Sequence, residues 1–521
     1  MPASQKIITK LRERRQIEAD LRQMLTARSE SEFRSRAQRI ASSGPEVIPT
    51  IVGNLDQADA RMLTAMGTVA SFLSHDEVAL ALRQAVLQPS QTDRGRLGAM
   101  TILERFLGHP PDDDLLTSLR DPEGEAIASL EEMLGQVEGN PSVLIQYVEE
   151  LDRLEPDIVL AVARSLRDMG IHATSVGQRK CAVEPLRMMA QDVRDEISAE
   201  AIRSLGAIQL PESAHALQTL IPITVPALRP MVERLLRKLQ FRGVEVNPLP
   251  LPDPDWRALI SPVNGLGQQS VWFIQEARST GQARTLSVLL SDRAGALEAV
   301  GHTQVPTLLL PLRKPLGHLH DIGLPDGSGA MLMLEANFDL GRRLVREALP
   351  QNWETQIPVA GPLRLLSPWL WGYDGADSLP PRVLPKLPAG DDGAMANSDR
   401  LLEHPAFGTW SARSEATLQA AEEILRHPGW KLDVWVNRLT SELFAEPLVV
   451  QMLSQRLVAM SEWLLLADDE LRAKQAHAAA KVVLEGPVQD QLLLQAVVRR
   501  DLEHALASLQ DSKPVFGMEQ T

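Results

Sequence analysis

The sequence predicts a mainly α-helical protein in three parts: an N-terminal α-solenoid (residues 1–245), a small central α+β domain (255–375) and a C-terminal helical domain (400–521). Apolar residues recur at helical spacing in short paired segments of the first part. In the second part the apolar period changes to alternation, and in the third it is helical again. A chain of 521 residues has room for these parts.

The solenoid is clearest in residues 197–239, where a turn with a proline joins two short amphipathic helices. The apolar faces consist of Ile197, Ala201, Leu205 and Ile208 in the first helix and Ala216, Leu217 and Leu220 in the second. Such a short pair cannot bury its apolar face alone, so we expect it to stack on further pairs. The alternative is one ordinary helical hairpin in a globular domain.

The stretch from Ala201 to Leu217 reads Ala-x-x-x-Leu-Gly-x-Ile-x-x-Pro-x-x-x-x-x-Leu. It resembles the armadillo-like HEAT repeat, in the short form of phycobilisome-lyase-like proteins. Weaker copies contain Gly67 and Gly98, so the resemblance covers roughly residues 30–240. It implies an α-solenoid that serves as a scaffold or adaptor, although a few enzymes also use such repeats. The rest of the chain resembles no family that we recognise.

Residues 5–27 read as a helix with one apolar stripe and many basic side chains. We interpret it as the capping helix of the solenoid. The alternative is a basic helix that contacts nucleic acid or an anionic membrane. Helix pairs are expected at 31–55, 58–87 and 93–119. Three aspartates at 112–114 lack the alternate spacing of a calcium loop and favour a helix N-terminus.

Four prolines in residues 247–254 predict an extended linker. The alternating runs at 270–277 and 285–291 predict an antiparallel hairpin. Residues 261–269 contain two glycines, but they precede a strand rather than follow one. We therefore interpret them as a turn and not as a phosphate-binding loop.

Three further elements are expected in the central domain. Residues 292–300 read as a short helix and residues 330–336 as a strand. Residues 339–349 carry an apolar face at helical spacing and read as an amphipathic helix. Together with the hairpin, these elements predict a small α+β domain.

Residues 378–399 are rich in proline, glycine and aspartate and predict a second, flexible linker. Residues 414–509 are helical in pattern, either as a separate bundle or as a second short solenoid. Because exposed flexible segments are cut first by proteases, we expect the first cut in this linker. It should release a stable C-terminal helical fragment.

His318, His320 and Asp321 form the densest group of possible metal ligands. Two imidazoles and a carboxylate suit zinc or iron, with Glu335 or Asp339 as further candidates. The neighbouring glycine-rich stretch favours an exposed loop, so we expect neither a metal nor a cofactor.

Trp353, Trp369, Trp371 and Tyr373 gather in about twenty residues of a chain that is only 4% aromatic. Tryptophan and tyrosine are enriched at binding surfaces, so these four residues are candidates for a pocket or an interface. The alternative is that they pack the central domain against neighbouring helices.

No nucleophile-elbow, phosphate-loop or zinc-protease motif occurs, so we do not expect an enzyme. The net charge of −15 argues against nucleic acid, and a lone cysteine, Cys181, indicates a reducing compartment. No run of apolar residues is long enough to span a membrane. We therefore expect a soluble, cytoplasmic, bacterial-type scaffold that binds another protein, with nucleic acid and membranes unlikely as partners. The alternative is an enzyme or small-molecule or metal binder centred on residues 255–375.

Overall fold

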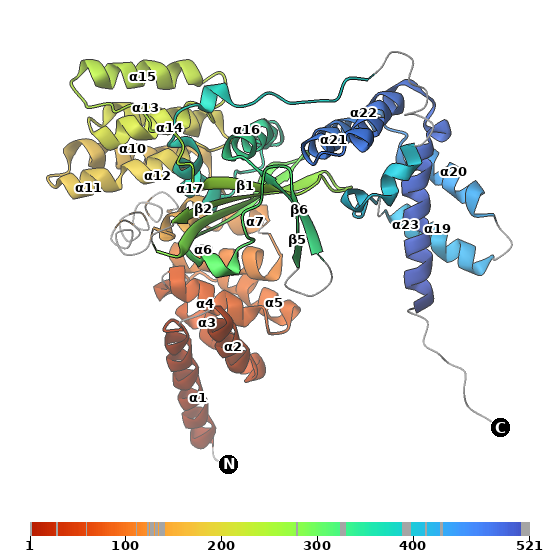
Figure 1. Ribbon diagram of the computed structural model, residues 1–521. Coiled ribbons are helices and arrows are strands. Elements are labelled where there is room, and N and C mark those ends of the chain that lie inside the picture. Colours follow the sequence, from red (N-terminus) through yellow and green to blue (C-terminus); the bar gives the residue numbers. More distant parts are fainter. Residues whose placement is uncertain are drawn as a thin grey trace, which may run out of the picture. The chain divides into compact units, whose positions relative to one another are not determined.

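The computed structural model describes residues 3–511 except 28–29, 59, 111, 122–123, 125–129, 131–133, 135–140, 278–279, 324–329, 388–397, 412–413 and 428–430. It is mainly helical with a central six-stranded antiparallel sheet (Figure 1). No helix within the described residues is long and apolar enough to cross a membrane. The chain forms two compact units: Met1–Met189 with Ala199–Ile208, and Ala190–Ser198 with Gln209–Thr521.

The first unit is helical throughout its described part. Its longer helices are α1 (Ala3–Met24), α2 (Glu30–Ala41), α3 (Ile48–Asn54), α4 (Ala60–Ala70), α5 (His75–Leu87), α6 (Asp93–Leu107), α9 (Val143–Leu151), α10 (Pro156–His172), α11 (Val176–Cys181) and α12 (Val183–Met189). α13 (Asp195–Ala207) belongs in part to each unit. The basic N-terminal helix is confirmed as α1, and the three aspartates are confirmed at the start of the short helix α7 (Asp113–Leu116).

The glycines of the weaker repeat copies lie where two helices approach each other closely. A Cβ atom on Gly67 of α4 would lie 2.3 Å from the ring of Phe106 on α6. A Cβ atom on Gly98 of α6 would lie 2.9 Å from Leu63 on α4. Larger residues would therefore push the pair apart. This close packing fits a helical repeat, while the stacking of pairs into a solenoid stays a prediction.

The second unit contains the sheet, whose strand order is β4-β3-β2-β1-β6-β5. The strands are β1 (Trp256–Ile260), β2 (Gln268–Ala277), β3 (Gln282–Ser291), β4 (Gly295–Pro306), β5 (Leu319–Gly323) and β6 (Ala330–Ala336). The predicted hairpin is confirmed as β2–β3, and the strand at 330–336 is confirmed as β6. The turn predicted at 261–269 joins β1 to β2, with Asn264 Oδ1 accepting from the N–H of Gln268 at 2.8 Å.

The helix predicted at 292–300 is wrong, because these residues form a turn and the start of β4. Their alanines, leucine and glutamate favour a helix locally. Gly295, however, has a φ of +76°, which reverses the chain after β3. β4 then pairs with β3 along its length, and this pairing outweighs the local helix propensity.

α16 (Phe338–Thr355) and α17 (Gly361–Trp371) pack on the sheet. The predicted helix at 339–349 is confirmed within α16, whose start is capped by Asn337 Oδ1 accepting from the N–H of Leu340 at 2.8 Å. Gly341 brings α16 close to β2, since a Cβ there would lie 2.6 Å from Phe273. Because side chains alternate along a strand, Arg257 and Leu259 of β1 point to the opposite face.

The remaining helices of this unit are α14 (Pro211–Leu220), α15 (Arg229–Phe241), α19 (Glu415–Arg426), α20 (Leu432–Leu443), α21 (Pro447–Leu466), α22 (Glu470–Glu485) and α23 (Leu492–Asp511). α21 and α22 form an antiparallel pair. The indole of Trp463 on α21 donates to Ile260 O at 3.0 Å, and that of Trp410 donates to Val263 O at 2.8 Å. The C-terminal part therefore shares buried hydrogen bonds with the end of β1 and with the turn after it, which argues against its release by a single cut.

Candidate functional site

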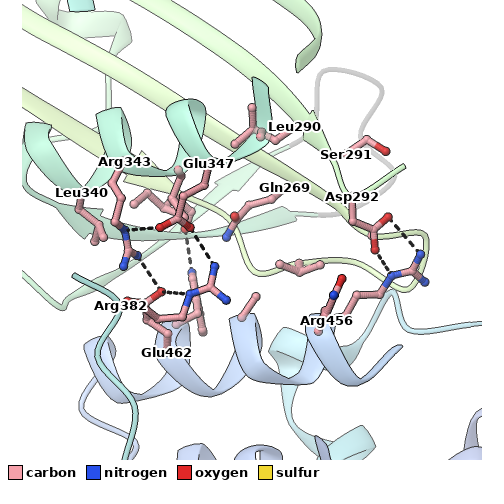
Figure 2. Close-up of a pocket in the computed structure, with 18 of the residues that line it drawn as sticks. Gln269, Leu290, Ser291, Asp292, Leu340, Arg343, Glu347, Arg382, Arg456 and Glu462 are labelled. Carbon is pink, nitrogen blue, oxygen red and sulfur yellow. Dashed lines mark hydrogen bonds and ion pairs between the residues drawn. The ribbon is translucent and has the colours of Figure 1, made fainter. Parts of the chain in front are cut away.

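A pocket of about 390 Å³ lies where α16, α21 and the ends of β1 and β3 meet (Figure 2). Its size lies within the range of small-molecule sites. Apolar side chains, among them Ile260, Leu334 and Trp463, form part of its wall. The rest of the wall is polar and includes three arginines, three carboxylates and three glutamines. Such a mixed lining can hold a small molecule with both a charged and an apolar part.

Two helical stripes form opposite walls of this pocket. On α16 the lining residues are Leu340, Arg343, Leu344, Glu347, Ala348 and Gln351. On α21 they are Gln455, Arg456, Ala459, Glu462, Trp463 and Leu466. Each set follows the spacing of one helix face, so both helices turn a stripe of mixed polarity inward.

Four of these charges form a network at one end of the pocket. Arg343 Nη2 donates to Glu462 at 2.7 Å, and Arg382 Nη2 donates to Glu347 at 2.9 Å. Arg382 Nε lies 3.6 Å from Glu462, which also accepts from the N–H of Val383 at 2.9 Å. Figure 2 shows the guanidinium of Arg382 extending between the two glutamates into the pocket.

Arg343 is only 2% exposed but is not fully hydrogen-bonded. Its Nη1 and Nε are buried and have no hydrogen-bond partner among the described residues. Nε does lie 3.7 Å from Glu347, which is an ion-pair contact but too long for a hydrogen bond. A buried donor without an acceptor is costly, so an acceptor entering the pocket would be favourable at this position.

A second ion pair closes the other end of the pocket. Arg456 contacts Asp292 through Nε at 2.5 Å and Nη2 at 3.2 Å, and its Nη1 donates to Gly265 O at 2.6 Å. Gly267 makes room for Asp292, because a Cβ there would lie 2.1 Å from the carboxylate. This arginine is therefore held in place by the β1–β2 turn.

The opposite face of the sheet carries a buried network around Arg257. Arg257 donates to Glu276 through Nε and Nη2, and to both oxygens of Glu335 through Nη1. Its Nη2 also donates to Pro311 O at 2.5 Å. His320 lies 2.8 Å from Glu335 and is 5% exposed. These bonds use all five donors of the guanidinium.

The predicted metal ligands are only partly brought together. His320 of β5 meets Glu335 of β6, but His318 and Asp321 are exposed. Asp339 instead accepts from Arg342 at 3.0 Å. Within the described residues, no group of three or more histidines, cysteines and acids is arranged to hold a metal.

The predicted aromatic group is divided. The indole of Trp256 donates to the hydroxyl of Tyr373 at 3.1 Å, and Phe338 stacks on Trp256 and meets Tyr373 edge to face. The guanidinium of Arg342 lies 5.3 Å from the ring of Trp371. Trp371 and Tyr373 also line a smaller cavity of about 330 Å³ next to α14 and α15.

The other two tryptophans of the group lie elsewhere. Trp369 is half-buried under Arg284, with 5.8 Å between guanidinium and ring centroid. Trp353 is half-buried near the end of α16. Packing therefore accounts for the contacts of Trp371 and Tyr373 with Arg342 and Trp256, and binding by the group stays a prediction.

A third charged cluster lies in the first unit, on α9. Burial raises the pKa of Glu150 to about 6, because desolvation of its charged form outweighs the lowering by Arg105 and Arg153. Burial also lowers the pKa of Arg153, which lies 2.6 Å from Glu104. A structural role is sufficient to account for this cluster, since the helices bury its charges against one another.

The sequence pattern did not predict the pocket on α16 and α21. One signal was available: Arg343 and Glu347 lie on the same helical face as Leu340 and Leu344. Charges on the inner stripe of an amphipathic helix point to a buried partner or a ligand. That partner, Glu462, lies far along the chain, so no local sequence pattern predicts the contact.

No protein-family model matches this chain, and neither a curated protein nor a solved structure does. The resemblance to the HEAT repeat therefore stays a prediction from the residues that carry it.

Proposed function

We propose that the second unit binds a small anionic molecule in the pocket between α16 and α21. The observation that carries this proposal is the buried Arg343, a residue of the pocket wall in which Nε and Nη1 lack a hydrogen-bond acceptor among the described residues. A carboxylate or a phosphate supplies acceptors in the geometry that a guanidinium favours.

The neighbouring charges define what such a ligand looks like. Arg382 is 38% exposed, and its ion pairs with described residues use Nε and Nη2, so among these residues Nη1 is left for the same anion. Glu347 and Glu462 repel a second negative charge near that end. A small monoanion with a short apolar part, which the walls around Trp463 can cover, fits best.

Calorimetric titration of the full chain with small carboxylates, their neutral amides and inorganic phosphate tests this proposal. We expect binding of a carboxylate or of phosphate, no binding of the amides, and at least tenfold weaker binding in Arg382→Gln. Arg426→Gln is the matched control, because Arg426 is exposed and pairs with Glu422 on its own helix. Equal affinity in both variants, or no anion bound, would reject the proposal.

A second proposed function is a protein scaffold, as the repeat resemblance implies. The supporting observation is that Leu80 and Leu87 lie seven residues apart on α5 and are 60% and 58% exposed. Residues at this spacing lie on one face of a helix and can anchor a partner helix. This role would be cytoplasmic, in keeping with the lone cysteine.

The scaffold proposal is tested by photo-crosslinking the full chain in cell extract. A specific partner should be captured by the wild type and lost in the double variant Leu80→Glu, Leu87→Glu. The control places glutamate at Leu471 and Leu484, which are exposed on α22 of the other unit. A capture pattern that the first variant leaves unchanged would count against α5 as the binding surface.

A further inference from the structure

The connection between β4 and β5, residues 307–316, presents leucines to solvent. Leu308 is 97% exposed, Leu309 76%, Leu312 85% and Leu316 63%. A single exposed leucine is ordinary, but four in so short a segment form an apolar patch that needs an explanation. We call these residues the leucine segment.

The leucine segment is fastened to the sheet beneath it. Arg257 donates to Pro311 O at 2.5 Å, and Glu335 accepts from the N–H of Lys314 at 3.3 Å. Leu310 packs inward against the cluster that contains Leu259. The segment therefore has an inner side that is held by the Arg257 network and an outer side that carries the exposed leucines.

The charge of the leucine segment differs from that of the chain. The chain has 68 acidic side chains, but none lies between Glu298 and Asp321. Arg313 donates to Pro254 O at 3.2 Å and Lys314 Nζ to Leu319 O at 2.6 Å. Both acceptors are neutral carbonyls, so within the described part of the chain no carboxylate forms an ion pair with these two positive charges.

We propose that the leucine segment inserts its leucines into the interfacial layer of an anionic lipid bilayer, with Arg313 and Lys314 on the lipid phosphates. Apolar side chains beside uncompensated cations are complementary to such a surface. The leucines line neither the pocket between α16 and α21 nor the cavity next to α14 and α15. A bilayer can surround such exposed side chains without a preformed pocket, which a small ligand would require.

This proposal revises the expectation that membranes are unlikely partners. That expectation considered the basic helix at 5–27 and the absence of a long apolar run. The exposure of the leucine segment depends on how the chain folds between β4 and β5, and the sequence pattern did not reveal it.

The test is flotation of the full chain with vesicles of phosphatidylcholine alone or with about one third phosphatidylserine, since anionic lipid attracts nearby cations. We expect the chain to float with the anionic vesicles, less so at high salt. Leu308→Glu with Leu312→Glu should lower the bound fraction at least tenfold. Leu448→Glu with Leu471→Glu is the control, because these leucines are 63% and 65% exposed on α21 and α22.

A second variant, Arg313→Ser with Lys314→Ser, should lose the preference for anionic vesicles. Lack of flotation by the wild type would overturn the proposal and leave a protein partner for the segment. Undiminished flotation of the first variant would also overturn it, and would assign any lipid binding to another surface such as the basic helix α1. Circular dichroism checks that each variant is folded.

Discussion

Arg257 and Arg343 lie on opposite sides of one sheet, and both are almost fully buried. Arg257 uses all its donors, on Glu276, Glu335 and the carbonyl of Pro311. Arg343 uses one nitrogen, on Glu462, and leaves two without a hydrogen bond to the described residues. We infer from this difference that the Arg257 network stabilises the fold, whereas Arg343 has nitrogens that could still bind a ligand.

Arg257→Met should have the largest effect on the free energy of unfolding. This change leaves Glu335 buried with His320 as its remaining side-chain partner, and removing one partner of a buried ion pair costs about 3–5 kcal/mol. We expect a loss of this order in the free energy of unfolding, measured by urea denaturation. A loss below about 1 kcal/mol would contradict the structural role of this network.

Arg343→Met should lower the free energy of unfolding by less than Arg257→Met does, on the order of 1–2 kcal/mol. Glu462 keeps Arg382 nearby and the N–H of Val383, and the change also removes two nitrogens without a hydrogen-bond partner among the described residues. The same urea experiment measures this loss. If Arg343→Met destabilises the chain as much as Arg257→Met, then the two networks do not differ in the way that their hydrogen bonds indicate.

Glu150 is a third, half-buried charge, and its positive neighbours offset its desolvation only in part. Its pKa is raised from 4.5 to about 6, so the folded state favours the protonated form. The stability that Glu150 contributes is full below pH 4.5 and is lost as the pH rises through 6. Glu150→Gln should therefore stabilise the chain above pH 7 by at most about 2 kcal/mol, reduced by solvent screening.

The measurement for Glu150→Gln is the pH dependence of unfolding in wild type and variant. The two curves should coincide near pH 4 and separate as the pH rises. Glu470→Gln is a control, because Glu470 is fully exposed and its pKa is lowered by Lys474 instead. A Glu150→Gln variant that is less stable than the wild type at pH 8 would contradict desolvation as the cause of the raised pKa.

A proteolytic cut in the predicted linker at 378–399 should have the smallest effect on stability. The predicted second linker includes residues 388–397, which lie outside the described residues. We expect mild proteolysis to cut first between 378 and 399, but the two pieces to stay together. The indole bonds of Trp410 and Trp463 and the Arg343–Glu462 pair join them. Separate elution of the pieces in size-exclusion chromatography would contradict this account.

Local patterns predict the elements whose apolar periods are regular. The β2–β3 hairpin, β6 and α16 follow from their apolar periods, and the packing glycines Gly67 and Gly98 from the repeat copies. β4 does not follow, because its composition favours a helix while its strand conformation depends on pairing with β3. The division into 1–245, 255–375 and 400–521 stays a prediction.

The candidate site depends on contacts that no local pattern contains. Arg343 and Glu462 are 119 residues apart in the chain, and Arg456 and Asp292 are 164 apart. His320 and Glu335 are both predicted as possible metal ligands, and in the structure they contact each other. The third member of their network is Arg257, a cation, and not a further metal ligand. The tryptophans are conspicuous in the sequence, whereas the charges on the inner faces of α16 and α21 carry the more useful signal.

The most direct test of the central claim is ¹⁵N–¹H spectroscopy of the arginine side chains, with the signals of Arg343 and Arg257 assigned by their loss in the two methionine variants. On titration with the anion that calorimetry identifies, the side-chain signals of Arg343 should shift to saturation. Those of Arg257, whose donors are all occupied, should not move. Shifts at Arg257 and none at Arg343 would contradict the claim that the pocket between α16 and α21 is a site for a small anion.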